Sequence, residues 1–394
     1  MLENVPLPIR RDPACPFSPS PETARLRATD PVATTQTFLP TGDLVDVRLV
    51  TGYGTAREAL ACPHLSSRPD AKLRTLIGEQ AGFLVAMDPP EHTRVRRLLT
   101  GEFTVRRINA FRPRFVEVVD EALDRMERTG GPVDLMTAFA LPLPSLVICE
   151  LLGVPYEDRA DFQRHSDTML DPSLTMEKQF ANAIEMHTYM GGLVAAQREK
   201  PGPDILGMLV REHGDDLSDD ELIGIGNLLL IAGHETTANM LGLGTLLLLS
   251  HPDQLALVRD DPTVVNGAIE EMLRYLSIVR NGAIRTATEK FTLAGQVIRE
   301  GERVAVSLPS ANRDPALTAE PDTFDVTRRP SAHVAFGHGI HQCLGQQLAR
   351  MELRVALPAL LRRFPALRLA VPYEELRYRE LAPVNGVLSL PVTW

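Results

Sequence analysis

The chain has 394 residues, 44% of them hydrophobic, which is enough to bury a large core, although only 5% are aromatic. It carries 41 Lys and Arg against 51 Asp and Glu, and a net charge of −10 argues against nucleic acid or an anionic membrane as a partner. Its four cysteines, Cys15, Cys62, Cys149 and Cys343, lie far apart, which excludes a readable disulfide framework or a CxxC redox motif.

The N-terminal part of the chain predicts an irregular arm followed by a small region of β-structure. Residues 1–21 contain six prolines and no apolar run typical of a signal peptide or membrane anchor, so we expect a soluble cytoplasmic protein. The pattern then predicts short elements in this order: a helix over Glu22–Ala28, strands at Thr37–Leu39 and Leu44–Val50 around a turn at Pro40–Asp43, and a helix over Gly54–Leu60.

Residues 62–87 form a long stretch without a clear pattern, and a loop of this length inside a compact domain is usually functional. It contains the apolar segment Phe83-Leu84-Val85; the alternative is an ordinary surface excursion. Two prolines then favour a helix start, which places His92 and Arg96 four residues apart on one helical face. Two donors so placed could bind a carboxylate, or they could belong to a solvated basic face.

Helical spacing dominates the middle of the chain. We predict helices over Ile108–Glu127 and Leu135–Leu152, and a further pair within residues 156–200 that is broken near residues 170–173. The longest helix begins at a capping box, Ser218 to Glu221, and runs to about residue 250. Its apolar residues occur on every side, which indicates burial at the centre of a large protein, and its polar residues argue against a membrane span.

The centre of this long helix reads Ala232-Gly233-His234-Glu235-Thr236-Thr237. A carboxylate and a hydroxyl inside a buried helix are costly unless they are used or paired. A zinc-protease motif would need a second histidine at position 238, which is Ala238, so that interpretation is excluded. A buried polar patch with satisfied hydrogen bonds is the plain alternative.

Two further regions have recognisable patterns. Glu271 and Arg274 are spaced at i and i+3, a spacing common in surface salt bridges. Short strands are expected after them, and strand character returns at the C-terminus around a turn at residues 384–386. The predicted strands are Ile278–Ile284, Thr292–Val297, Arg303–Ser307 after a turn at Gly301, and Tyr378–Trp394.

The segment from Phe336 to Gly345 holds Cys343 between glycines and directly precedes an amphipathic run over Gln346–Arg363. A cysteine just before a helix N-terminus is favoured as a thiolate, which is the electron-donating ligand that haem iron needs for O–O cleavage. Two alternatives are a small buried hydrophobic residue and a zinc site. The zinc site would use four residues whose spacing fits no common zinc module: His333, His338, His341 and Cys343.

The pattern Phe-x-x-Gly-x-x-x-Cys-x-Gly resembles the haem-binding signature of the cytochrome P450 monooxygenases. The segments around His92, Glu235, Glu271 and Arg285 are similar to other motifs of that family, in the same order. The resemblance implies one P450 domain over residues 1–394, mainly α with small β-sheets (α+β), in which a long central helix and the cysteine loop sandwich the haem. The β-rich parts are expected at residues 30–60, 278–310 and 375–394.

The resemblance also implies roles for individual residues. Cys343 is the expected thiolate ligand of haem b iron; Thr236 is expected to hold dioxygen through a hydrogen bond, and Glu235 to relay protons to it. The other cofactor contacts are expected at His92, Arg96, Arg285 and His341 for the propionates, and at Gly233, which thins the helix for dioxygen, Phe336 and Gly345. A structural trio is expected from Glu271, Arg274 and Arg328, with Arg329 as a rival to Arg328. The expected substrate contacts are Phe83, Leu84, Val85, Met169, Leu170, Ala232, Val279, Arg280, Asn281 and Asn385.

In function the chain resembles actinobacterial members that tailor secondary metabolites. We expect hydroxylation or epoxidation of a bulky lipophilic molecule such as a macrolide or other polyketide, using O2. Electrons would come from NAD(P)H through a ferredoxin reductase and a ferredoxin, docked on Arg97, Arg107, Arg112 and Arg350. We expect a monomer that binds neither nucleic acid nor membrane. The alternatives are a peroxide-driven peroxygenase, which would not need Glu235 and Thr236, and a non-enzymatic haem-binding protein.

Overall fold

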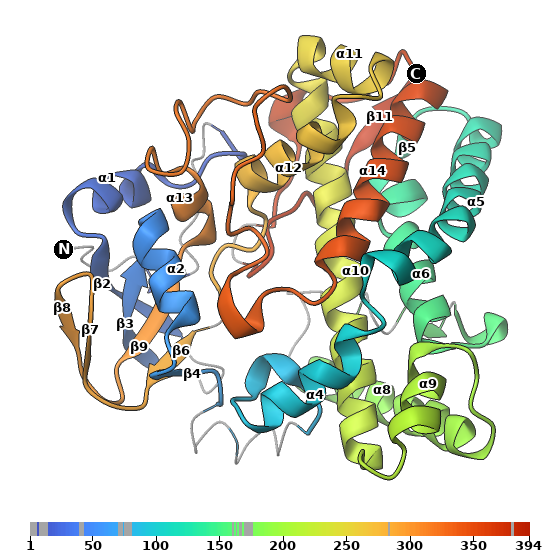
Figure 1. Cartoon of the computed structure of the whole chain (residues 1–394). Helices are drawn as coiled ribbons and strands as arrows, with labels where there is room; N and C mark the ends of the chain where they lie inside the picture. The colour runs from blue at the N-terminus through green and yellow to red at the C-terminus, as the bar shows by residue number, and fades with distance from the viewer. Residues whose placement is uncertain are drawn as a thin grey trace.

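The computed structural model describes residues 6–7, 15–38, 43–69, 74, 81–159, 161–162, 164, 168, 176–282, 284–379 and 382–394. The larger sheet and the N-terminal helices lie on one side of the molecule, and the long helices fill the other (Figure 1). The predicted fold class, mainly helical with small sheets, is therefore confirmed.

Most predicted helices are present, with bounds that differ by a few residues. The α-helices are α1 Pro21–Thr29, α2 Tyr53–Ala61, α4 Glu91–Thr100, α5 Val105–Thr129, α6 Pro142–Leu152, α8 Met176–Glu199, α9 Ile205–His213, α10 Asp219–Leu249, α11 Pro252–Asp260, α12 Val265–Leu276, α13 Leu308–Asn312 and α14 Gln346–Arg363. Short 3-10 turns occur at η1 Leu84–Ala86, η3 Tyr156–Asp158, η4 Gly339–His341 and η5 Tyr373–Glu375.

The predicted helix over Leu135–Leu152 is present as a helical segment over Met136–Leu152. It consists of a π-helical turn, η2 Met136–Ala140, followed by α6 from Pro142. Pro142 and Pro144 have no N–H to donate to the preceding turn, so the hydrogen-bond ladder cannot run through them. Gly153 ends α6 in a left-handed conformation, as the sequence predicted (φ 72°). The expected break near residues 170–173 lies outside the described residues.

The main sheet joins the N-terminal strands to strands from residues 285–306. Its order is β1-β2-β3-β9-β6-β4. The strands are β1 Pro6–Leu7, β2 Val32–Phe38, β3 Leu44–Val50, β4 Leu65–Ser66, β6 Arg285–Ala287 and β9 Arg303–Val306. A three-stranded sheet combines β10 Arg368–Leu369, β11 Pro391–Thr393 and β5 Val133–Asp134, and β7 Phe291–Leu293 pairs with β8 Gln296–Ile298.

Several strand predictions need correction. The segment Ile278–Ile284 is not a regular strand; it makes isolated bridges through Val279 to Val384 and through Asn281 to Ser307. Residues 292–297 are a hairpin and not one strand, because Ala294 and Gly295 turn the chain with positive φ (48° and 78°).

The remaining strand predictions differ at their ends. The first strand begins earlier than predicted, at Val32, and residues 39–42 around its turn lie outside the described residues. Among its described residues, the C-terminal segment has β11 and two isolated bridges, one from Tyr378 to Val387 and one from Val384 to Val279. In these segments, a strand-like sequence pattern therefore predicts extended backbone more reliably than it predicts pairing in a β-ladder.

Helix α10 is the element on which the helical part is built, and it runs through the middle of that part in Figure 1. Ser218 and Glu221 form the predicted capping box, each side chain bonding the other's backbone N–H. Residues 237–248 of the helix are all buried, and α10 packs against α6, α8 and α14. Within the described chain, no single helix is long and apolar enough to cross a membrane.

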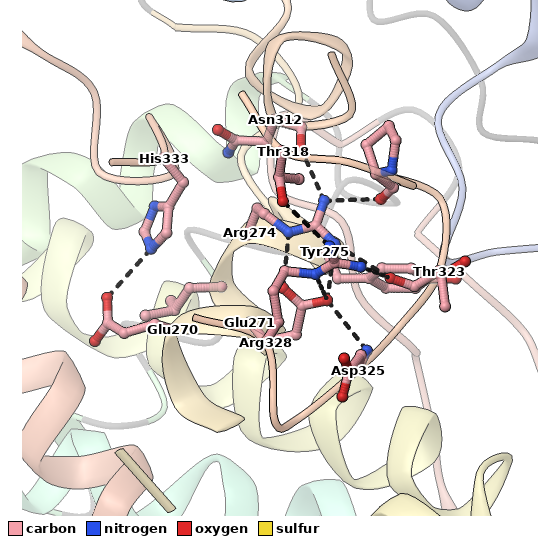
Figure 2. A network of polar contacts seen from close by, with 12 residues as sticks. Glu270, Glu271, Arg274, Tyr275, Asn312, Thr318, Thr323, Asp325, Arg328 and His333 are labelled. Atoms are coloured by element: carbon pink, nitrogen blue, oxygen red, sulfur yellow. Dashed lines mark hydrogen bonds and ion pairs between the residues drawn. The ribbon is translucent and has the colours of Figure 1, made fainter. Parts of the chain in front are cut away.

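The structure brings Glu271, Arg274 and Arg328 together at the end of α12 (Figure 2). Arg274 donates two hydrogen bonds of 2.8 Å to the Glu271 carboxylate, and Arg328 Nε donates one of 3.2 Å. Arg274 also donates to the carbonyls of Asn312 and Pro321, at 2.9 and 2.8 Å. These contacts bind α12 to the chain segment that leads toward Cys343.

We predict that Arg274→Ala lowers the free energy of unfolding by about 3–5 kcal/mol, because it leaves the buried Glu271 carboxylate without its main partner. Chemical denaturation followed by circular dichroism measures the loss. The matched control is Arg25→Ala, which removes an exposed i,i+3 pair with Glu22 and should cost less than about 1 kcal/mol. Equal losses for the two variants would contradict the structural importance of the trio.

Candidate functional site

The loop that carries Cys343 is closed by backbone hydrogen bonds. The Cys343 N–H donates to the Phe336 carbonyl at 2.9 Å, and the Gln342 N–H donates to the Gly339 carbonyl at 3.0 Å. Gly339 has φ 76°, and a Cβ on it would lie 2.8 Å from the Leu60 carbonyl oxygen of α2. Only glycine allows both this conformation and this approach.

The Cys343 thiol lies just before the N-terminus of α14. Its side chain has exposed surface, yet desolvation by the surrounding atoms raises the pKa of the thiol. The backbone N–H of Gly345 and the charges of Arg96 and Arg350 act in the opposite direction and favour the thiolate. The zinc alternative has no support, because the His333 ring bonds Glu270 and does not converge on the cysteine.

Four basic side chains from three separate elements gather beside this loop. His92 and Arg96 come from α4, Arg285 from β6 and His341 from η4. The rings of His92 and His341 are 4.3 Å apart between centroids, and His341 Nε2 lies 3.2 Å from the Ser67 hydroxyl. Both ring nitrogens of His92 lack a hydrogen-bond partner among the described residues, although the side chain is buried.

This cluster is electrostatically unfavourable without an anion. Burial and the charges of Arg96 and Arg285 lower the pKa of His92, despite the opposing charge of Asp88. Burial, with the nearby His92 and Arg285, lowers the pKa of His341 to about 4. Burial also lowers the pKa of Arg96 and of Arg285. Crowded donors with unsatisfied nitrogen atoms fit a group carrying carboxylates, such as the two propionates of a haem.

The centre of α10 combines exposed surface with one constrained hydroxyl. Ala232 is exposed and Thr236 is partly exposed, one turn apart on a helix that is otherwise largely buried. The Thr236 hydroxyl donates its proton to the Ala232 carbonyl at 2.8 Å. Since that is its only proton, the hydroxyl oxygen presents lone pairs to any further partner and acts there as an acceptor.

Gly233 has a packing role between α10 and α6, and its expected role beside dioxygen stays a prediction. A Cβ at this position would lie 2.3 Å from Cδ1 of Ile148, a residue of α6. The absence of a side chain at Gly233 therefore allows α10 and α6 to pack closely.

Glu235 is buried and forms an ion pair with Arg379, a residue of the C-terminal segment that the sequence did not single out. The Arg379 N–H donates to the Gly386 carbonyl at 2.9 Å. Gly386 in turn sits against Asn239, where a Cβ would lie 1.6 Å from the amide oxygen. The buried carboxylate indicated that a cation must be near, but 144 residues separate the two partners, so local sequence could not identify it.

The residues Arg280 and Asn385, expected as substrate contacts, contact each other, and their role toward a substrate stays a prediction. Both side chains are buried, and Arg280 donates to the Asn385 amide oxygen at 3.1 Å and to the Arg379 carbonyl at 2.7 Å. These residues thus fix the C-terminal segment beside Glu235. Asn281 lines a small crevice with residues of the N-terminal segment, Pro19, Ser20 and Thr23.

The other expected substrate contacts are placed as follows. Leu84 is buried in the core, Phe83 packs against it, and Val85 is exposed. Val279 bridges Val384. Met169 and Leu170 lie outside the described residues. Of the expected contacts, Ala232 is the one with exposed surface on α10, next to Thr236.

The sequence patterns also did not identify a second buried carboxyl group, that of Glu352 in α14. Burial raises its pKa to about 8, against the effect of a hydrogen bond with Thr237 of α10. It is therefore protonated at neutral pH and links the two helices without a net charge.

Comparisons with known proteins give consistent results. A family model described as cytochrome P450 matches residues 45–370. Cytochrome P450-SU2 of Streptomyces griseolus is 46% identical over 400 residues, which cover 100% of this chain and 98% of the relative. Pentalenic acid synthase of Streptomyces avermitilis is 43% identical, covering 99% and 98%. The crystal structure of CYP105P1 in complex with filipin I matches with a TM-score of 0.90 at 44% identity and covers 99% of both chains.

We predict that Gly233→Ala lowers the free energy of unfolding by about 1–3 kcal/mol, because its Cβ overpacks against Ile148. The double variant Gly233→Ala with Ile148→Val should recover part of this loss. Gly54→Ala in α2 is the control, since a Cβ there meets open space. Thermal unfolding of the wild type, the two single variants Gly233→Ala and Ile148→Val, the double variant and the control measures the coupling, and strictly additive losses would exclude the contact.

Proposed function

Since this chain belongs to the cytochrome P450 family and is a P450 monooxygenase, we propose that it hydroxylates or epoxidises a bulky lipophilic small molecule of secondary metabolism. The observation that carries the proposal is the thiol of Cys343 just before α14, with a backbone N–H and two arginines that favour its anionic form.

The residues present fit a haem. We propose that Cys343 is the axial thiolate ligand, beside Phe336 and Gly345. His92, Arg96, Arg285 and His341 hold the propionates, whose charge compensates the crowding of these four basic groups. When bound, the haem supplies the iron chemistry by which dioxygen is activated, and the thiolate donates electron density for O–O cleavage.

The chain's own contribution to oxygen activation is proton control at α10. The Thr236 hydroxyl donates its own proton to the Ala232 carbonyl, so its oxygen accepts a hydrogen bond from any further group. In this way Thr236 holds a proton-donating group beside α10. Glu235 is the proposed relay for protons. Its partner Arg379 is the cation placed against this carboxylate.

Two relatives support the class of substrate. One is named for the formation of pentalenic acid, and another has been solved with filipin I bound. In this chain, the apolar Phe83, Val85 and Ala232 offer surface suited to a lipophilic molecule of that size. We propose that the substrate is recognised mainly by shape and apolar contact.

We propose that electrons come from NAD(P)H through a ferredoxin reductase and a ferredoxin. Arg97 and Arg112 are exposed, and Arg107 is exposed but paired with Glu102 at 3.2 Å, so these three remain candidates for a docking surface. Arg350 is withdrawn from that set, because its guanidinium is largely buried and is paired with Glu270. Glu235 and Thr236 favour reductive oxygen activation over peroxide-driven chemistry.

The carbon monoxide difference spectrum of the dithionite-reduced protein tests the proposed ligand. The wild-type protein should give the strongly red-shifted Soret band of a haem thiolate, and Cys343→Ser should lose it because an alcohol does not ionise in its place. Cys15→Ser, which alters a remote cysteine, should leave the band unchanged. A thiolate spectrum retained by Cys343→Ser would exclude this residue as the ligand.

Replacing the Thr236 hydroxyl tests proton control. Thr236→Ala should lower the product formed per NAD(P)H about tenfold and release the difference as hydrogen peroxide, because the proton donor is no longer held in place. Thr236→Ser keeps the hydroxyl and should retain most of the coupling. Product, peroxide and NAD(P)H are measured in the same reaction. Equal coupling in all three proteins would remove Thr236 from this role.

A further inference from the structure

Helix α12 carries two adjacent glutamates that serve different networks. Glu271 points toward Arg274 and Arg328, whereas Glu270 points away from them toward His333 (Figure 2). The first network joins α12 to the segment before the cysteine loop. The second reaches α14, the helix that follows the cysteine.

The second network centres on a two-point ion pair between Glu270 and Arg350. Arg350 Nε and Nη2 donate to the two Glu270 carboxylate oxygens at 2.7 and 2.9 Å, and both side chains are 15% exposed. Arg350 also donates to the side-chain and backbone oxygens of Gln346, at 3.0 and 3.3 Å. These contacts hold the guanidinium group in one orientation. A Lys ammonium group in such a pair would not be oriented in this way.

The orientation places the Arg350 charge against the cysteine loop. Its guanidinium carbon lies 4.5 Å from the centroid of the Phe336 ring, within the range of a cation–π contact. The Phe336 carbonyl accepts the Cys343 N–H, so the residue under Arg350 is the residue that closes the loop. Arg350 is also one of the two arginines whose charge acts on the Cys343 side chain.

The carboxylate of Glu270 is ionised at any neutral pH. Burial raises its pKa, but the hydrogen bonds from His333 and Arg350 outweigh burial and bring it to about 2. His333 Nδ1 accepts the Ala335 N–H at 3.3 Å, so a neutral His333 carries its proton on Nε2 and donates it to Glu270 at 3.2 Å. The pair therefore consists of one fixed negative charge and one fixed positive charge, and the positive charge lies over Phe336 of the loop.

We infer that Arg350, fixed by Glu270, is a positioning residue of the cysteine loop, and that its charge raises the reduction potential of the redox group held by Cys343. The inference rests on the proposed function, because it requires a haem on that cysteine. The physical cause is Coulombic: a cation beside the ligand loop favours the iron state with one more electron. Glu270 partly cancels this effect and at the same time holds the guanidinium over Phe336.

Spectroelectrochemical titration of the substrate-free holoprotein tests the inference. Arg350→Met should shift the midpoint potential to more negative values, because the cation is lost. Glu270→Gln should shift it to more positive values, because the amide still bonds Arg350 but no longer cancels its charge. Opposite shifts are the signature of charge, since a merely loosened loop would move both variants in one direction. Shifts of the same sign, or no shift in Arg350→Met, would overturn the inference.

The chain offers a matched control and a rescue. Arg354 is on the same helix and also pairs with Glu270, at 3.1 Å, but among the described contacts it touches neither Phe336 nor Cys343. Arg354→Met should therefore shift the potential by less than half as much as Arg350→Met, and Arg350→Lys should restore most of it. An equal shift in Arg354→Met would assign the effect to general surface charge and overturn the inference.

Two failures can be separated. If the wild-type protein binds no haem through a thiolate, its carbon monoxide spectrum shows this and the proposed function fails. If the wild-type spectrum is that of a haem thiolate and the variant potentials lack opposite signs, only the inference fails. Should Arg350→Met not retain haem, the positive shift of Glu270→Gln and the small shift of Arg354→Met decide the question in its place.

Discussion

The desolvation of one cysteine is the constraint on which the rest of the site depends. Burial disfavours the Cys343 thiolate, and the fold opposes this with the Gly345 N–H at the start of α14 and with two arginines. Each contribution requires an exact backbone path. Gly339 allows the loop to approach α2, and the Phe336 carbonyl closes it. In a loop without these contacts, burial would raise the pKa of the cysteine thiol and no neighbouring group would lower it.

Helix α12 supports that path through two buried ion networks. Glu271 fixes the segment before the loop through Arg328, and Glu270 fixes the helix after it through Arg350. Breaking either pair leaves a charge in a poorly solvated place, so each network holds its segments in one arrangement. The pairing of Glu235 with Arg379 does the same for the C-terminal segment. The structural ion pairs and the proposed proton relay are therefore held by one kind of interaction.

Structural features that depend on residues close together in the sequence were predicted well. The capping box at Ser218, the i,i+4 pair His92 and Arg96, and the start of α14 after Cys343 were all visible in sequence, because helix geometry alone fixes them. Strand predictions were weaker, since Ile278–Ile284 is extended without a ladder and the 292–297 segment is a hairpin. A strand is defined by a partner that local sequence does not contain.

The sequence by itself determined the fold class, the long buried helix and the candidate ligand cysteine, because periodicity and a short motif carry that information. Only the tertiary structure decided which residues that are distant in sequence contact one another. It paired Glu235 with Arg379, placed Gly233 against Ile148, bonded Arg280 to the Arg379 carbonyl and paired Arg350 with Glu270. The physical reason is that a buried charge or a missing Cβ specifies the need for a partner, whereas the partner's identity depends on the packing of distant elements.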